Sequence, residues 1–174
     1  MLGLGNSITT GGAEYSLGGT YTSDFTTGTD GWEPYSVEGT LTLLANQTID
    51  STGGWLKGIY DTNQTNASGV QLNPPFSIVS GMDLEISYKV YIPNLGGSEW
   101  LNAGGSGAAT DPDLRVSFSG GFKHDNLSYN TTTSITATDT TVGATNFIEF
   151  NFAVIDKPQD GAVFYIKDII YTVS

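Results

Sequence analysis

Hydrophobic and polar side chains alternate along three stretches of the chain, with the period of two that places every second residue on one face of a β-strand. In residues 82–92 the apolar and aromatic positions alternate with charged or polar ones, and residues 146–155 and 114–118 repeat the pattern. Each stretch predicts a strand with one face in a core and the other toward solvent. The predicted inward residues are Met82, Leu84, Ile86, Tyr88, Val90 and Ile92, then Leu114, Val116 and Phe118, then Ile148, Phe150, Phe152 and Val154.

Five further segments have strand composition, which brings the expected number of strands to about eight. They are residues 15–25, 39–49, 55–61, 132–139 and 162–173. Glycine and proline pairs such as Gly53-Gly54 and Pro74-Pro75 separate them, and no window shows helical periodicity with caps. Many short strands joined by such turns predict an all-β fold, an antiparallel sandwich or barrel.

The length of 174 residues fits a single domain. Residues 1–13 are glycine-rich and weakly patterned, so we expect an N-terminal arm there and one β-sandwich over residues 14–174. Residues 94–112 are predicted to form a long loop, and loops of that length are usually functional or mobile.

Charge and cysteine content exclude several classes of function. The formal net charge is −12, and the single arginine, Arg115, leaves no basic cluster for nucleic acid or an anionic membrane surface. Cysteine is absent, which excludes disulfides, thiolate metal sites and cysteine nucleophiles. The opening residues have no secretory pattern and no apolar run could span a bilayer, so we expect synthesis in a cytoplasm and release only by lysis or within a particle.

Catalytic groups are scarce. His124 is the only histidine, and we expect it in a solvated turn because its neighbour Asp125 cannot orient it and no nucleophile motif is present. Asp111-Pro112-Asp113 has the composition of a turn. With 18 acidic residues a carboxylate pair for glycoside chemistry stays open, since sequence spacing does not fix the separation of the two groups.

Two segments near the ends of the predicted sandwich resemble a known family. Residues 23–32, Ser-Asp-Phe-Thr-Thr-Gly-Thr-Asp-Gly-Trp, followed by Gly39-Thr-Leu-Thr-Leu, and residues 161–169, Gly-Ala-Val-Phe-Tyr-Ile-Lys-Asp-Ile, resemble the first and last strands of jelly-roll carbohydrate-binding modules. The resemblance implies a jelly-roll sandwich, in which we place Trp32 in the core. It implies sugar binding less strongly, because one fold hosts many functions. Separately, residues 1–8 look like the openings of small structural proteins of tailed bacteriophages.

The same resemblance implies a calcium ion between the first and last strands. Asp24 and Asp168 occupy the matching positions, and carbonyl groups near Gly31 would complete the site. Strict alternation also puts Asp168 on a face with Phe164 and Ile166, where a buried carboxylate needs a cation or hydrogen bonds. The alternative is a β-bulge that turns Asp168 to solvent. The sequence leaves both open.

Six aromatic residues lie where alternation demands no core position. In carbohydrate-binding modules flat rings stack on sugars, and similar rings anchor protein interfaces. We also expect more than half of the six to be half-buried at the edge of the sandwich. The candidates are Tyr35, Trp55, Tyr60, Tyr91, Trp100 and Tyr129.

Three functions follow from these observations. The first is a non-enzymatic virion protein, most simply a capsid decoration or cement protein on the outer surface, with weak glycan binding. Its partners would be the major capsid protein or other virion proteins. We expect it to form a trimer or another homo-oligomer. The alternative is a carbohydrate-binding module, or a tail or fibre protein, that contacts host-surface glycans. A glycoside-lyase type of enzyme comes last.

Overall fold

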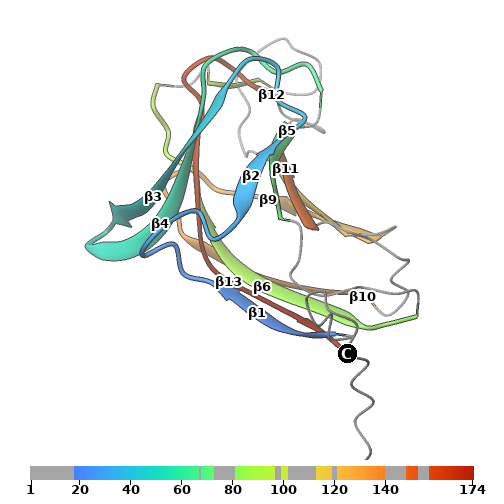
Figure 1. Cartoon of the computed structure of the whole chain (residues 1–174). Helices are drawn as coiled ribbons and strands as arrows, with labels where there is room; N and C mark the ends of the chain where they lie inside the picture. Colours follow the sequence, from blue (N-terminus) through green and yellow to red (C-terminus); the bar gives the residue numbers. More distant parts are fainter. Residues whose placement is uncertain are drawn as a thin grey trace, which may run out of the picture.

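The chain folds as two antiparallel sheets packed face to face, with a small third sheet at one end (Figure 1). The computed structural model describes residues 18–66, 68–72, 81–96, 99–101, 113–118, 121–139, 148–152 and 157–174. These residues contain strands and no helix, so none of them forms a helix that could cross a membrane. The all-β sandwich expected from the sequence is confirmed.

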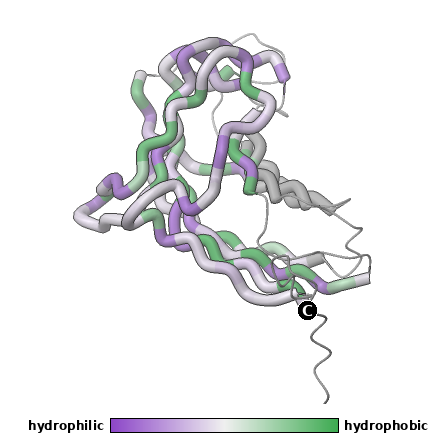
Figure 2. The backbone as a smooth tube through the Cα atoms, viewed as in Figure 1, coloured by the Kyte–Doolittle hydropathy of each residue, from purple (hydrophilic) through white to green (hydrophobic). Residues whose placement is uncertain are grey.

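The larger sheet has six strands in the order β10-β6-β13-β4-β3, and β1 pairs with β13 beyond the end of β4. Along these strands hydrophobic and polar positions alternate (Figure 2), so one face meets the second sheet and the other faces out. Its strands are β1 (Gly19–Ser23), β3 (Leu41–Ile49), β4 (Thr52–Tyr60), β6 (Leu84–Tyr91), β10 (Thr133–Asp139) and β13 (Val163–Val173).

The smaller sheet has five strands in the order β2-β5-β11-β8-β9. Two short strands, β7 and β12, pair separately. The bounds are β2 (Trp32–Tyr35), β5 (Ser68–Leu72), β8 (Asp113–Phe118), β9 (Gly121–Asn126) and β11 (Ile148–Phe152), with β7 (Trp100–Leu101) and β12 (Lys157–Pro158) in the third sheet.

Aromatic side chains join the two large sheets in the core. Phe150 of β11 is fully buried, and its ring centroid lies 5.0 Å from that of Trp32 and 4.6 Å from that of Tyr88 on β6. The Trp32 indole N–H donates to the Ser23 hydroxyl at 2.9 Å, which satisfies its one polar atom. The core position predicted for Trp32 is therefore confirmed.

Alternation predicted the inward residues well wherever their side chains are described. Leu84, Ile86, Tyr88, Val90 and Ile92 are each at most 2% exposed. Leu114 and Phe150 are also buried, and Met82 packs partly buried against the core. The predicted strand count of about eight missed short strands, above all β2, β5 and β9.

Two other sequence predictions have different outcomes. The turn predicted around His124 is wrong, because residues 121–126 form β9 and His124 pairs with Arg115 of β8. The predicted N-terminal arm, residues 1–13, and the phage-like opening lie outside the described residues. Within the predicted loop 94–112, the described part includes β7.

A polar clasp ties the β2–β3 connection to the β4–β5 connection. The Gln64 side chain is 1% exposed, and its amide accepts from the Glu38 N–H at 2.8 Å and donates to the Glu38 carbonyl at 2.7 Å. The Glu38 carboxylate accepts from the Thr65 hydroxyl and from the Asn66 amide. These bonds lower the pKa of Glu38 below its ordinary value, with the Thr65 hydroxyl as the main cause.

Candidate functional site

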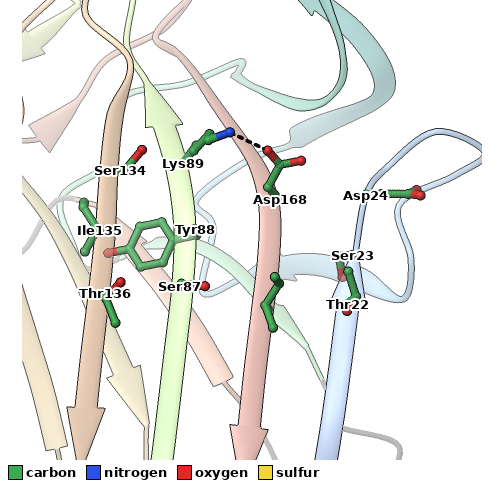
Figure 3. A pocket seen from close by; sticks show the side chains of 11 residues that line it. Thr22, Ser23, Asp24, Ser87, Tyr88, Lys89, Ser134, Ile135, Thr136 and Asp168 are labelled. Atoms are coloured by element: carbon green, nitrogen blue, oxygen red, sulfur yellow. Dashed lines mark hydrogen bonds and ion pairs between the residues drawn. The ribbon is translucent and has the colours of Figure 1, made fainter.

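The outer face of the six-stranded sheet is hollowed where β13 changes its neighbour. The first half of β13 pairs with β4, its second half pairs with β1, and β6 runs along the opposite side of both halves. Residues of β1, β6, β10 and β13 surround a pocket of about 420 Å³ at this change of partner, here called the bulge pocket (Figure 3). Its size falls within the roughly 300–1,000 Å³ of small-molecule sites.

A β-bulge in β13 places Asp168 at the rim of this pocket. The pairing of β13 with β6 shifts register between Lys167 and Ile170, and Asp168 adopts a φ of 50°. The extra residue restores the alternation with Ile169 buried, so Asp168 and Ile170 both face out. Of the two sequence alternatives for Asp168, the structure thus shows the bulge.

The Asp168 carboxylate lies close to the ammonium groups of two lysines. The Lys89 ammonium group lies 2.8 Å from one carboxylate oxygen, and that of Lys167 lies 3.9 Å from the other. Figure 3 shows the Lys89 side chain crossing from β6 toward Asp168. The side chains of Lys89 and Asp168 are 43% and 39% exposed, so this pair adds little to stability and both groups keep contact with solvent.

Asp24 lines the same pocket but is engaged in its own turn. Its carboxylate accepts from the Thr26 N–H at 3.0 Å and from the Thr26 hydroxyl at 2.8 Å. The N–H bond is the larger cause of a pKa of Asp24 below its ordinary value. Figure 3 shows the Asp24 side chain pointing away from Asp168.

The turn around Gly31 is organised by hydrogen bonds within the chain. Gly31 has a φ of 82°, which glycine adopts without strain. One oxygen of the Asp30 carboxylate accepts from the N–H groups of Asp24 and Phe25. In the part of the chain that is described, no three acidic or histidine side chains gather as metal ligands. The calcium site at Asp24, Gly31 and Asp168 therefore stays a prediction.

Three of the six candidate aromatics are buried, so their rings are not exposed to a ligand in this structure. Tyr60 is fully buried, donates its hydroxyl to the Ser68 carbonyl at 3.1 Å, and has its pKa raised by burial. Trp100 is 1% exposed within the main core cluster. Trp55 is 2% exposed, and the Lys167 ammonium lies 5.9 Å from the centroid of its ring.

The other three candidates are half-buried, as expected for rings at the edge of a sandwich. Tyr91 packs edge-on against Tyr165 with ring centroids 5.9 Å apart, and its hydroxyl donates to the Asn130 side-chain oxygen at 3.4 Å. Tyr129 packs against the core. Tyr35 lies on β2 at the edge of the five-stranded sheet, opposite Gly69.

The five-stranded sheet carries a second candidate surface, which the sequence analysis missed. Trp32, Leu72, Val70 and Phe150 mark its core face, so the register positions between them belong to its outer face. Two rows of paired positions cross the whole sheet on that side, and we call them the polar rows. They are Tyr35, Gly69, Asn151, Arg115 and His124 in one row, and Glu33, Gln71, Glu149, Ser117 and Phe122 in the other.

The polar rows bring together residues that are far apart in sequence. The only arginine and the only histidine of the chain occupy paired positions, with Asn151 next to Arg115 on the other side. At the β2 edge the Gln71 amide donates to the Glu33 carboxylate at 2.8 Å. Alternation had placed Glu149 and Asn151 outward, but only strand pairing shows which residues are their neighbours.

Both surfaces are suited to binding by hydrogen bonds. The hydroxyl groups of the bulge pocket and the Gln71 amide and Glu33 carboxylate of the polar rows can donate or accept hydrogen bonds, and tyrosine adds a flat apolar face. Neither surface, in the side chains that the structure describes, assembles a nucleophile with a base.

Among known proteins, the chain is similar in fold to several solved structures. No protein-family model and no curated protein sequence matches the chain. Among solved structures, the C-terminal family 22 carbohydrate-binding module of Clostridium thermocellum Xyn10B matches with a TM-score of 0.55 and 15% identity over 88% of this chain and 91% of that module. The xylan-binding CBM22-1 domain of Paenibacillus barcinonensis Xyn10C matches with a TM-score of 0.54 and 15% identity over 92% of this chain and 97% of that domain.

A longer Clostridium thermocellum chain, the CBM22-1 and GH10 modules of Xyn10B solved with xylohexaose, matches with a TM-score of 0.53 and 18% identity. The match covers 91% of this chain and only 28% of that one. At these identities the likeness shows a shared fold, a β-sandwich of the CBM22 kind. It confirms the fold that the family resemblance implied. None of the three is a virion protein, so the predicted phage origin gains no support.

Proposed function

We propose that this chain is a non-catalytic carbohydrate-binding domain, and that its ligand lies across the polar rows of the five-stranded sheet. The observation that carries the proposal is the pairing of Arg115 with His124 in a row that runs through Asn151 to Tyr35. In a chain of net charge −12, these are scarce residues gathered at one place.

The chemistry of the rows fits a neutral glycan. Planar polar side chains recognise pairs of neighbouring hydroxyls with two hydrogen bonds, and an aromatic ring packs against the C–H face of a sugar. Gly69, which pairs with Tyr35, has no side chain that could compete with a ligand for the face of the ring. Solved domains of the same fold are described as xylan-binding, which makes xylo-oligosaccharides the first ligand to test.

Titration calorimetry with xylohexaose tests the proposal on the whole chain. Removing one aromatic contact worth about 1–1.5 kcal/mol weakens binding about tenfold, so we expect that loss for Tyr35→Ala. Gln71→Ala is expected to weaken binding less, because its partner Glu33 stays exposed to water. Thr42→Ala, an exposed position on β3, is the matched control and is expected to bind normally.

The proposal fails if xylo-, cello- and manno-oligosaccharides all leave the heat signal unchanged. It also fails if Tyr35→Ala and Thr42→Ala bind equally well. The capsid decoration role, its virion partners, its oligomeric form and its location in the particle stay predictions. The phage part of them rests on residues 1–8, outside the described residues.

A further inference from the structure

The bulge pocket lies on the opposite side of the sandwich from the polar rows. It is formed by the outer face of the six-stranded sheet, whereas the polar rows belong to the outer face of the five-stranded sheet. The packed core separates the two surfaces. A ligand in the bulge pocket would therefore bind independently of one on the polar rows.

Hydroxyl groups from three strands ring the pocket. Thr136 of β10, Ser87 of β6 and Thr22 of β1 fall in one row across the sheet, with Ile170 of β13 between the last two. Ser134 lies in the next row, beside Lys89. Each hydroxyl can both donate and accept a hydrogen bond, so the ring suits a ligand that is itself rich in hydroxyls.

The ion pair supplies a stronger contact at one side of this ring. The Lys89 nitrogen and the Asp168 oxygen are 2.8 Å apart, one a donor with hydrogens to spare and the other an acceptor. Two neighbouring hydroxyls of a sugar ring can meet such a pair, one accepting from the ammonium and the other donating to the carboxylate. Charge-assisted bonds of this kind are about twice as strong as neutral ones.

The charged residues that line the pocket are Lys89, which is positive, and Asp168 and Asp24, which are negative. Their sum is −1, which disfavours an anionic ligand. Lys167 lies outside the lining and donates to the Gly53 carbonyl at 2.6 Å. Ile170, 43% exposed, adds an apolar surface for the C–H groups of a ligand.

The bulge adds evidence from the backbone. A left-handed φ is strained at residues other than glycine, though less so at Asp, and bulges that re-aim one side chain recur beside binding sites. Here the bulge moves a carboxylate from the predicted core face to the rim of a pocket. From the pocket, the hydroxyl ring and the Lys89–Asp168 ion pair, we propose that the bulge pocket is a second ligand site, for one unit of a neutral sugar.

Amide-resolved NMR titration with methyl β-D-xylopyranoside tests this site separately, with glucuronate as the anionic probe of similar size. We expect saturable shifts at Ser87, Lys89, Thr136 and Asp168 with the neutral glycoside, and at least fivefold weaker binding of glucuronate. Asp168→Asn keeps the left-handed backbone accessible and removes the charge, and it is expected to weaken the glycoside about tenfold.

A filling variant and a control complete the design. Ser87→Leu occupies the pocket without touching the ion pair and is expected to abolish the shifts, whereas Thr20→Ala, exposed on β1 outside the pocket, leaves them unchanged. Glycoside shifts confined to β2, β5, β8, β9 and β11 would overturn this site and leave the polar rows in place. The site is likewise overturned if Ser87→Leu binds like the unaltered chain, or if glucuronate binds as well as the glycoside. Shifts at the pocket without xylohexaose binding at Tyr35 would overturn the proposed function alone.

Discussion

The two faces of the six-stranded sheet differ although they share the same strands. On β6, Ile86 and Tyr88 point into the core and are at most 2% exposed, while Ser87 and Lys89 between them line the bulge pocket. The inner face is covered along its length by the second sheet, so its side chains fit one another closely. The second sheet does not cover the outer face, so its side chains pack only against neighbours on the same sheet. Changes of equal size should therefore affect stability on one face and binding on the other.

The largest loss of stability is expected for Phe150→Ala. Its fully buried ring contacts Trp32 and Tyr88 and so joins the two sheets. Removing it should lower the free energy of unfolding by about 3–5 kcal/mol, measured by urea denaturation. Ser134→Ala on the outer face should change it by less than about 0.5 kcal/mol. Similar losses for both variants would contradict the difference between the faces.

The next effect concerns Gly58, where the inner face has no room for even a methyl group. A Cβ atom there would lie 2.2 Å from the Phe164 ring on the paired strand. We expect Gly58→Ala to cost about 1–3 kcal/mol through overpacking. Adding Phe164→Leu should recover part of the loss, because the smaller side chain makes space. If the stability losses of the two single variants simply add in the double variant, the close contact is not the cause.

A smaller effect is expected at the bulge itself. Asp168→Gly relieves the left-handed backbone and loses only an exposed ion pair, whereas Asp168→Leu keeps the strain. The glycine variant should be more stable than the leucine variant by about 1–2 kcal/mol. Equal thermal stability of the two would mean that Asp168 does not hold a left-handed conformation in solution.

The pH dependence of stability should reveal how much Glu38 contributes to the polar clasp. Because the pKa of Glu38 is lower in the folded chain, its stabilising contribution is complete above the ordinary value of 4.5 and is lost as pH falls through the folded-state pKa. Glu38→Gln should therefore lose less stability than the unaltered chain when the pH falls below about 4.5. Thermal melts between pH 7 and pH 3 measure this. Parallel curves would exclude Glu38 as a source of the acid sensitivity.

Calcium removal is expected to give the smallest change. If a cation joins Asp24 and Asp168, EDTA should lower the melting temperature, but only slightly, since Lys89 already compensates Asp168. Asp24→Asn should then melt at the same temperature with and without EDTA. A melting temperature of the unaltered chain that EDTA leaves unchanged would end the calcium hypothesis.

The sequence predicted the fold better than the site. Long alternating segments such as residues 82–92 are unambiguous because burial repeats every second residue along them. Short strands escaped notice: β2 contains Pro34, and β5 has five residues with little alternation. Without these strands the neighbours of Glu149, Asn151 and Arg115 were unknown. The burial of Trp55 was missed because it depends on tertiary neighbours such as Lys167, which lies on a strand far away in the sequence.

The sequence alone determined which side chains of the long strands face inward and excluded every chemistry that needs a thiol, since both follow from local pattern and composition. The tertiary structure decided where Asp168 points, because the bulge arises where β13 exchanges β4 for β1 as its neighbour. It also decided that Arg115, His124 and Asn151 lie side by side. Strand pairing brings together residues distant in the chain, and no local period encodes that choice of partner.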